Sequence, residues 1–210
     1  EVKRVKEDST VIDSFNTDLA QEDIIRDDVL VLQTNNGSIT VYGGDDAAGI
    51  SAENNILLKS AENNEDNADN EDEDNAANIS LNASVTSIGG HISLHCTDVL
   101  VQAADGDITA QAAAMTIDLL ADAGIEMHSG AVTSSNDGDI RYEATTGHIV
   151  LESINAGNAN VLLKAPGGSI LDLESEASVD VTASGLALIA GKNIGAGTNP
   201  IETTVKTLSA

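Results

Sequence analysis

Two Asp-Gly-Asp triplets, at 105–107 and 137–139, carry the residue types that could bind a metal ion. Calcium takes several carboxylate and carbonyl oxygens that converge on one point. Neither triplet matches the glycine-rich calcium-binding nonapeptide, and neither continues into an EF-hand loop that ends in glutamate. We therefore expect corner turns whose polar side chains face water, with calcium binding as the alternative and no other cofactor. The calcium ligands in that alternative are Asp105, Asp107, Asp137 and Asp139.

The segment 60–77 is a second place where cations could gather, because it holds eight acidic residues and no basic one. Such a composition cannot bury apolar surface, so we expect a solvated acidic loop between two strands. Diffuse calcium binding is the alternative. An ordered site would need several carboxylates to converge, and nothing in the sequence arranges that.

His91 and His95 suggest zinc, but their spacing argues against it. On a strand that rises about 3.3 Å per residue they lie about 13 Å apart, whereas ligands of one ion lie within a few ångströms. Ile92, Leu94 and Cys96 take the alternate positions, so we expect both histidines to point to solvent. Cys96 is then a small buried side chain, and as the single cysteine it cannot form an internal disulfide or supply a metal-binding cysteine framework.

Asp139 and Arg141 are the residues that suggest catalysis, since they point outward together on one predicted strand. Polysaccharide lyases and glycosidases built on β-helices use such acid and base pairs. Sugar binding usually needs aromatic platforms, however, and the nearby Tyr142 lies in the inward register. Basic residues are also too few to hold an acidic polysaccharide. We therefore expect no enzyme, with a β-helix lyase or hydrolase as the less favoured alternative.

These residues lie within a repeated pattern of glycine, a small or polar residue, an apolar residue, a polar residue and a second apolar residue. Copies begin at Gly37, Gly90, Gly106, Gly138, Gly147 and Gly168. Glycine-free stretches with the same alternation lie between them. They cover residues 56–58, 79–81, 99–101, 117–119, 125–127, 161–163, 179–181 and 186–188. The alternation predicts short strands that are buried on one face, and glycine before a strand permits a tight corner.

The spacing of the copies predicts the fold class. Successive copies lie 9, 16 or 21 residues apart in places, which is typical of a parallel β-helix whose corner loops vary while its strands stay in register. Aromatic residues make up only 1% of the chain, which fits a narrow core of Ile, Leu, Val and Ala. An all-β sandwich is the alternative, because Asn36-Gly37 and Asp105-Gly106 resemble hairpin turns. We expect about eight coils between residues 37 and 197, or roughly 40 Å of rod.

Residues 1–30 differ from the rest, and we expect a cap or connecting segment there, with a short helix over 18–26. The predicted β-solenoid then covers residues 31–210, with the acidic loop at 60–77. The chain begins at Glu1 and not at Met, which suggests a processed chain or an excised fragment.

The net charge of −26, from 35 acidic and 9 basic residues, excludes general nucleic-acid binding through phosphate neutralisation. It also disfavours anionic membranes. The apolar runs cover about six to nine residues, whereas about 20 are needed to span a bilayer. We therefore expect no nucleic-acid partner and no membrane insertion, and interpret the charge as a means of solubility in an extracellular or high-salt setting, or of cation binding.

Several stretches near the end of the chain resemble the repeats of filamentous-haemagglutinin-like proteins, which are very large secreted or surface proteins of bacteria. They are residues 168–172, 179–183, 186–195 and 199–210. The resemblance covers about 79–210 well and 30–59 loosely. It implies a right-handed parallel β-helix that serves as a secreted or cell-surface rod, structural or adhesive, with no catalytic residues.

The partners expected of such a rod are its neighbouring coils, identical subunits end to end, and a host or cell-surface ligand that the sequence does not name. The ends of a solenoid are open β-edges. The alternative function is therefore a subunit of a head-to-tail extracellular filament, in which residues 1–16 complete a neighbour.

Overall fold

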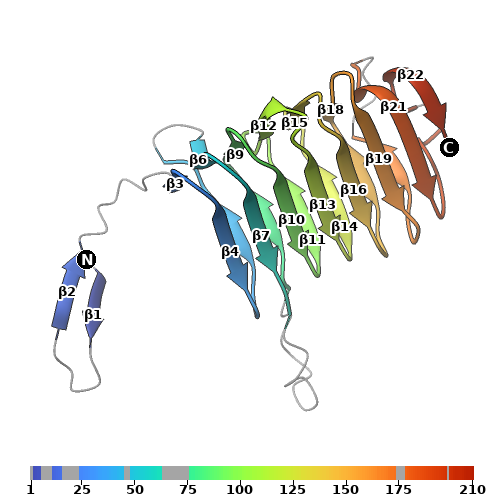
Figure 1. Ribbon diagram of the computed structural model, residues 1–210. Coiled ribbons are helices and arrows are strands. Elements are labelled where there is room, and N and C mark those ends of the chain that lie inside the picture. Colours follow the sequence, from blue (N-terminus) through green and yellow to red (C-terminus); the bar gives the residue numbers. More distant parts are fainter. Residues whose placement is uncertain are drawn as a thin grey trace, which may run out of the picture.

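The protein is all-β, and its strands stack in parallel as a β-solenoid of about seven coils (Figure 1). This confirms the predicted fold class and corrects the expected eight coils to seven, or about 34 Å at the usual spacing of about 4.8 Å. In the described part of the chain, no helix is long and apolar enough to cross a membrane. The computed structural model describes residues 2–5, 11–15, 24–44, 48–62, 76–173, 178–197 and 199–210.

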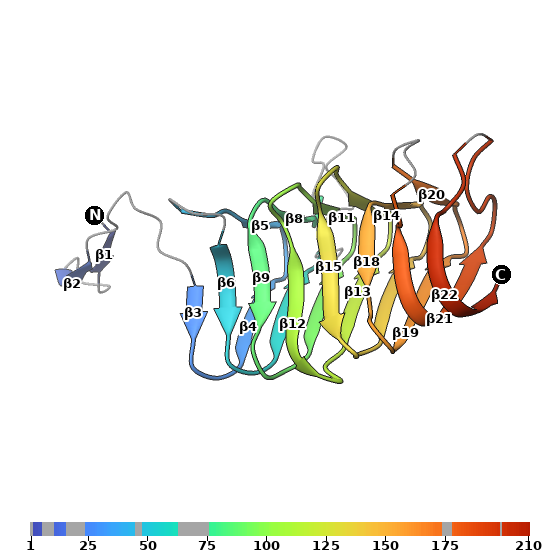
Figure 2. The ribbon, with the colours of Figure 1, turned by 90° about the horizontal axis from the view of Figure 1, so that it is seen from above.

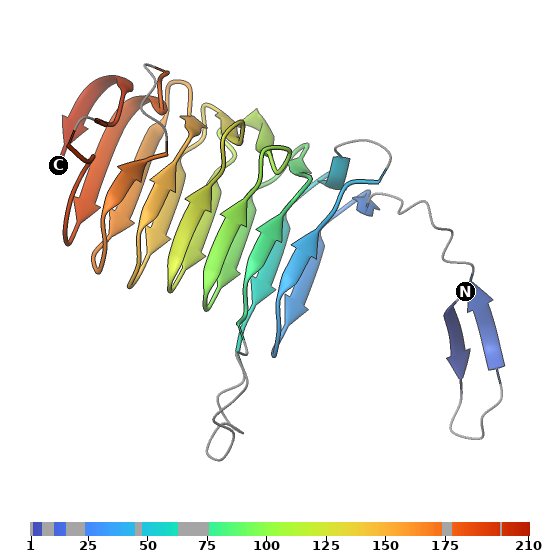
Figure 3. The ribbon, with the colours of Figure 1, turned by 180° about the vertical axis from the view of Figure 1, so that it is seen from behind.

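Each coil runs along three faces, which we name A, B and C in chain order; Figure 2 shows face A from β3 onward, and Figure 3 shows the stack from behind. Face A contains β3 (Ile24–Arg26), β6 (Ala48–Ala52), β9 (Ser84–Ser87), β12 (Ile108–Ala113), β15 (Val132–Asn136) and β18 (Ser153–Asn155). Face B contains β4 (Leu30–Thr34), β7 (Ile56–Ser60), β10 (Ile92–Cys96), β13 (Ile117–Ala121), β16 (Ile140–Ala144) and β19 (Asn160–Ala165). Face C contains β5 (Ile39–Val41), β8 (Ile79–Leu81), β11 (Val99–Gln102), β14 (Gly124–Met127), β17 (Ile149–Leu151) and β20 (Ile170–Asp172).

The last strands join two of these faces. β21 (Val181–Ala190) pairs with β18 through its first half and with β19 through its second half, so it runs along face A and then face B. β22 (Thr203–Ser209) follows the same path beside β21. The two strands expected at 179–181 and 186–188 are therefore one strand that begins at Val181.

The strand register gives the length of a coil. On face B, Ile92 lies beside Ile117, Ile117 beside Ile140 and Ile140 beside Val161, so successive coils take 25, 23 and 21 residues. The coil from Ile56 to Ile92 takes 36 residues, because it contains the acidic segment. Residues 63–75 of that segment lie outside the described ranges.

The repeated glycine pattern marks corners and not coils. Its copies lead into β5, β10, β12, β16, β17 and β20, which belong to all three faces. The 9 residues from Gly138 to Gly147 therefore lead from one corner to the next, whereas the 21 residues from Gly147 to Gly168 complete a coil. At Gly147 a Cβ atom would overlap the carbonyl oxygen of Ala123 in the preceding coil, so glycine is needed there for close backbone approach.

The core is a stack of inward apolar side chains. On face B one row runs from Leu30 to Leu186, and the members between them are at most 1% exposed. Full burial of such a side chain stabilises the fold by about 1.5–3 kcal/mol. Cys96 and Tyr142 are buried, as expected from the alternation.

Three polar side chains interrupt the apolar core at one level, one from each face. Gln102 of β11, Thr133 of β15 and Tyr142 of β16 are each 0% exposed. The Thr133 hydroxyl lies 2.6 Å from the Tyr142 hydroxyl and donates to Gln102 Oε1 at 3.1 Å. The Gln102 amide donates to the Val132 carbonyl at 3.0 Å. This buried triad satisfies its own polar atoms, as a buried network must.

The solenoid begins earlier than the expected boundary at residue 30, because β3 already pairs in parallel with β6. The predicted helix is wrong over Ile24–Arg26, which form β3, and its residues 18–23 lie outside the described ranges. Upstream, β1 (Val2–Val5) and β2 (Val11–Phe15) pair with each other in antiparallel register.

Candidate functional site

The candidate calcium ligands of the two Asp-Gly-Asp turns lie at corners, where three of them bind the next coil. Asp107 Oδ1 accepts the backbone N–H of Val132 at 2.8 Å. Asp139 Oδ1 accepts both the backbone and side-chain N–H groups of Asn160, at 2.9 and 3.0 Å. Asp137 Oδ1 accepts the backbone N–H of Asn158 at 2.7 Å, and Asp105 is exposed.

None of these four carboxylates belongs to the one group of metal-ligating side chains that converges among the described residues. Calcium binding at the two turns therefore stays a prediction without a converging ligand set. The sequence did place these residues at corners, but it did not reveal that their carboxylates hold successive coils together.

Two histidines make the same kind of hydrogen bond between coils. In each case the histidine stands just before the first inward residue of a strand and accepts the backbone N–H of the residue at the same position one coil later. His91 Nδ1 accepts the N–H of Thr116 at 3.0 Å, and His148 Nδ1 accepts that of Ser169 at 3.0 Å. His91 is exposed, as expected. His95 lies on the outer side of face B, where its side chain is 34% exposed and its Nε2 lies 3.4 Å from Asp118.

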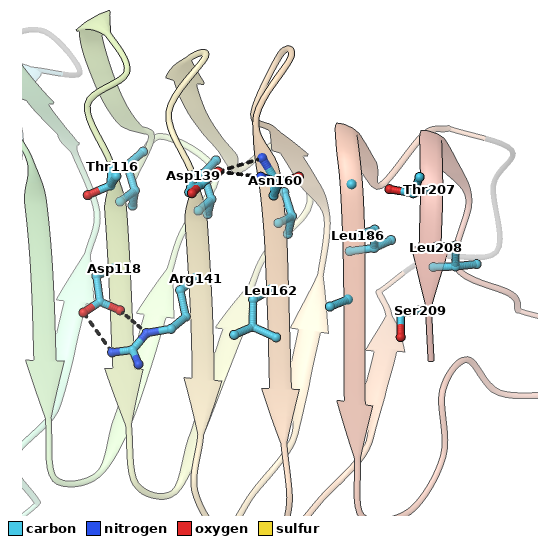
Figure 4. Close-up of a pocket in the computed structure, with 15 residues that line it drawn as sticks. Thr116, Asp118, Asp139, Arg141, Asn160, Leu162, Leu186, Thr207, Leu208 and Ser209 are labelled. Carbon is cyan, nitrogen blue, oxygen red and sulfur yellow. Dashed lines mark hydrogen bonds and ion pairs between the residues drawn. The ribbon is translucent and has the colours of Figure 1, made fainter.

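An ionic cluster on the outer side of face B surrounds Asp118. Arg141, its neighbour on the adjacent strand, donates to both carboxylate oxygens of Asp118, from Nε at 2.7 Å and from Nη2 at 3.0 Å (Figure 4). Arg141 Nη1 also lies 3.4 Å from Glu143, whose other oxygen accepts Lys164 Nζ at 2.7 Å. The guanidinium of Arg141 therefore pairs with Asp118. It does not pair with Asp139, the residue expected to act with it as an acid and base pair.

The cluster keeps Asp118 ionised. Burial alone would raise the pKa of this carboxyl, but hydrogen bonds from His95 and Arg141 outweigh burial and lower the pKa to about 2. The pKa of Arg141 is raised, mainly by its hydrogen bonds to Asp118. A general acid must hold a proton near neutral pH, so Asp118 is unsuited to that role.

A groove of about 700 Å³ crosses the same face beside this cluster. Residues of β13, β16, β19, β21 and β22 line it, with Leu162 and Leu208 among its apolar members (Figure 4). The hollow forms because β21 contributes the small residues Gly185 and Ala187, between larger side chains on β19 and β22. Its volume lies within the range of small-ligand sites.

A group of three carboxylates, Asp172, Asp180 and Glu202, was missed by the sequence analysis. One oxygen of each lies within 4.8 Å of the other two. Burial, together with the carboxylates of Asp172 and Glu202, raises the pKa of Asp180 to about 7, despite a hydrogen bond from the Glu202 backbone N–H. One signal was available, since Asp172 occupies the inward position that Leu151 holds one coil earlier.

Cys96 shows no sign of reactivity. It is 5% exposed, and burial raises its pKa to about 11, so it is a thiol and not a thiolate at neutral pH. The groove, the ionic cluster and the three carboxylates are therefore the places from which a function can be argued. The comparisons add no relative, since no protein-family model, no curated protein and no solved structure matches this chain.

Proposed function

We propose that this chain is a structural segment of an extracellular, surface-exposed rod, and that face B is the side by which the rod adheres to a ligand. The observation that carries the proposal is the continuous stack of inward side chains, which passes from coil to coil along the described part of the solenoid. The resemblance to filamentous-haemagglutinin-like repeats supports the same role and location.

The stack suits a mechanical role because each coil repeats the contacts of the one before it. Backbone hydrogen bonds connect neighbouring coils on all three faces, and the inward side chains pack on their equivalents. Corner side chains such as Asp107 and His148 add further bonds between coils. A load along the axis is thus shared by many small interactions.

Adhesion through face B is supported by its surface. The chain has nine lysines and arginines, and Lys59, Arg141 and Lys164 all lie on this face. The groove, which Arg141 helps to line, offers apolar contact next to hydrogen-bonding groups, which is the usual make-up of a binding site.

Surface location is tested with an epitope tag in place of residues 63–75, within the full chain in the cells that make it. Antibody should label intact cells, and external protease should remove the label. Adhesion is tested with beads that carry the chain: Ala187→Trp should fill the groove and reduce attachment, whereas Val150→Trp, outward on face C, should not. A tag reached only after lysis would contradict the location, and equal attachment by both variants would contradict the role of face B.

The two ends of the solenoid favour a head-to-tail filament as a second candidate. Leu208 and Ile194 continue inward rows of the core, and in the last described coil they are 59% and 42% exposed. At the other end Ile24 is 40% exposed. A solenoid repeats by translation, so its first coil is complementary to its last, and such contacts build open filaments.

Sedimentation velocity at rising protein concentration separates the two candidates. A filament subunit should form a ladder of oligomers, more strongly at 0.5 M NaCl, because salt screens the net charge of −26. Leu208→Asp should abolish the ladder. A single species at all concentrations and salt levels would contradict the filament and leave the rod segment.

A further inference from the structure

The three carboxylates near the C-terminal end of the solenoid come from successive coils. Asp172 ends β20, Asp180 precedes β21, and Glu202 precedes β22. An oxygen of each lies within 4.8 Å of the other two. We propose that Asp172, Asp180 and Glu202 form a calcium site that fastens the last coils to one another.

Two buried oxygen atoms at this end of the solenoid lack hydrogen donors. Glu202 Oε2 and Asn199 Oδ1 have less than 1 Å² of exposed surface, and neither has a hydrogen-bond partner in the described structure. Asp180, the third carboxylate of the group, is 2% exposed. Buried acceptors almost always find a donor, an ordered water or an ion, and beside converging carboxylates a cation satisfies both the oxygens and their charge.

The group of three carboxylates is also strongly negative. None of the ion pairs in the described part of the chain involves Asp180 or Glu202. Three carboxylates this close in a poorly hydrated place repel one another, in a protein that already carries a net charge of −26. A divalent cation bound between the three carboxylates would relieve this repulsion.

The ligand atoms favour calcium over other ions. The converging ligands are all oxygens, with no histidine or cysteine among them, which disfavours zinc and softer metals. Calcium accepts an irregular set of carboxylate, amide and carbonyl oxygens, whereas magnesium demands a near-ideal octahedron. Extracellular calcium modules bind with Kd values on the order of 10⁻⁴–10⁻³ M, which is the range expected for three carboxylates.

The position of Asp172 gives the site its structural role. Asp172 lies beside Leu151 in the register of face C, so an acid replaces an apolar residue of the core. Asp180 Oδ2 accepts the backbone N–H of Glu202 at 2.8 Å, which makes Asp180 and Glu202 neighbours across one coil step. A calcium ion held by all three would tie β20, β21 and β22 together near the C-terminal end of the solenoid.

The test is thermal unfolding of the full chain in 0.15 M NaCl, with excess calcium or with EDTA. At a calcium concentration near 100 times Kd, the Tm of the wild-type chain should rise by about 5–10 °C. Asp180→Asn keeps the acceptor for the Glu202 N–H but removes a charge. In EDTA this variant should therefore be at least as stable as wild type, whereas its calcium-induced rise in Tm should fall below half.

Glu202→Gln is the second variant and should behave in the same way. Glu126→Gln is the matched control, because it removes one exposed carboxylate on face C outside the site and should keep the full calcium response. The proposal is overturned if calcium leaves the wild-type Tm unchanged, or if both site variants keep the wild-type response. It is also overturned if Glu126→Gln loses as much as they do, since calcium would then act only through overall charge.

Discussion

The buried polar triad of Gln102, Thr133 and Tyr142 offers a sharp test of the core, because Gln102 is the member on which the others depend. Its carbonyl accepts from Thr133, and its amide donates to Val132. Replacing Gln102 by Leu leaves one of the two hydroxyl groups without an acceptor, and removes a donor from the Val132 carbonyl. Each orphaned buried group costs about 1–3 kcal/mol, so we expect Gln102→Leu to destabilise the protein by about 2–4 kcal/mol.

Tyr142→Phe should cost less, about 1 kcal/mol, because Thr133 still donates to Gln102 after the phenol is removed. The triple variant with Gln102→Leu, Thr133→Val and Tyr142→Phe has no buried polar side chain left to satisfy in this cluster. It should recover most of the stability that Gln102→Leu loses. The triple variant should therefore be more stable than Gln102→Leu, although it carries two more substitutions.

The assay is urea unfolding at pH 7, followed by far-UV circular dichroism, with equal slopes required for a comparison of free energies. All variants can be made in a chain that carries Cys96→Ser, which avoids thiol chemistry. The reasoning would be refuted if Gln102→Leu unfolded within 0.5 kcal/mol of wild type. A triple variant less stable than Gln102→Leu would refute it as well.

Two further predictions concern face B. Asp118 has a folded-state pKa of about 2 against an ordinary 3.8, so its ionic contribution is complete above about pH 5 and is lost progressively as pH falls through 2 to about 1. In urea unfolding, Arg141→Met should therefore cost about 1–2 kcal/mol at pH 7, a value reduced for solvent screening, and almost nothing at about pH 1. An equal loss at both pH values would speak against the pair. Asp139→Asn should have the same free energy of unfolding as wild type, since it keeps the acceptor for Asn160, whereas Asp139→Ala should lose about 0.5–1 kcal/mol of stability. Equal losses in the two variants would show that the charge of Asp139 matters and not its hydrogen bond to Asn160.

Strand positions could be predicted from the sequence because alternation over a few residues is a local signal. The stretches expected at 56–58, 117–119 and 161–163 lie inside β7, β13 and β19. The inward register of Cys96 and Tyr142 was correct for the same reason. The coil length was not predictable in this way, because the glycine pattern recurs at all three corners.

The sites depend on which residues lie side by side in neighbouring coils, and that depends on corner lengths. Asp118 and Arg141 are 23 residues apart, and Asp180 and Glu202 are 22 apart, although each pair is in direct contact. A corner longer by one residue would change the partner without altering any local pattern. The structure was therefore needed to bring together the ionic cluster and the three carboxylates.

The central claim, that the chain is a parallel solenoid in this register, is tested most directly by distances along one outer row of face B. Spin labels at Val31 and at Leu162, Ala187 or Ser209, in a chain without Cys96, lie five, six and seven coil steps apart. At about 4.8 Å per step, pulsed electron spin resonance should give about 24, 29 and 34 Å between backbone positions. Distances that fail to grow by one equal step per coil would contradict the solenoid.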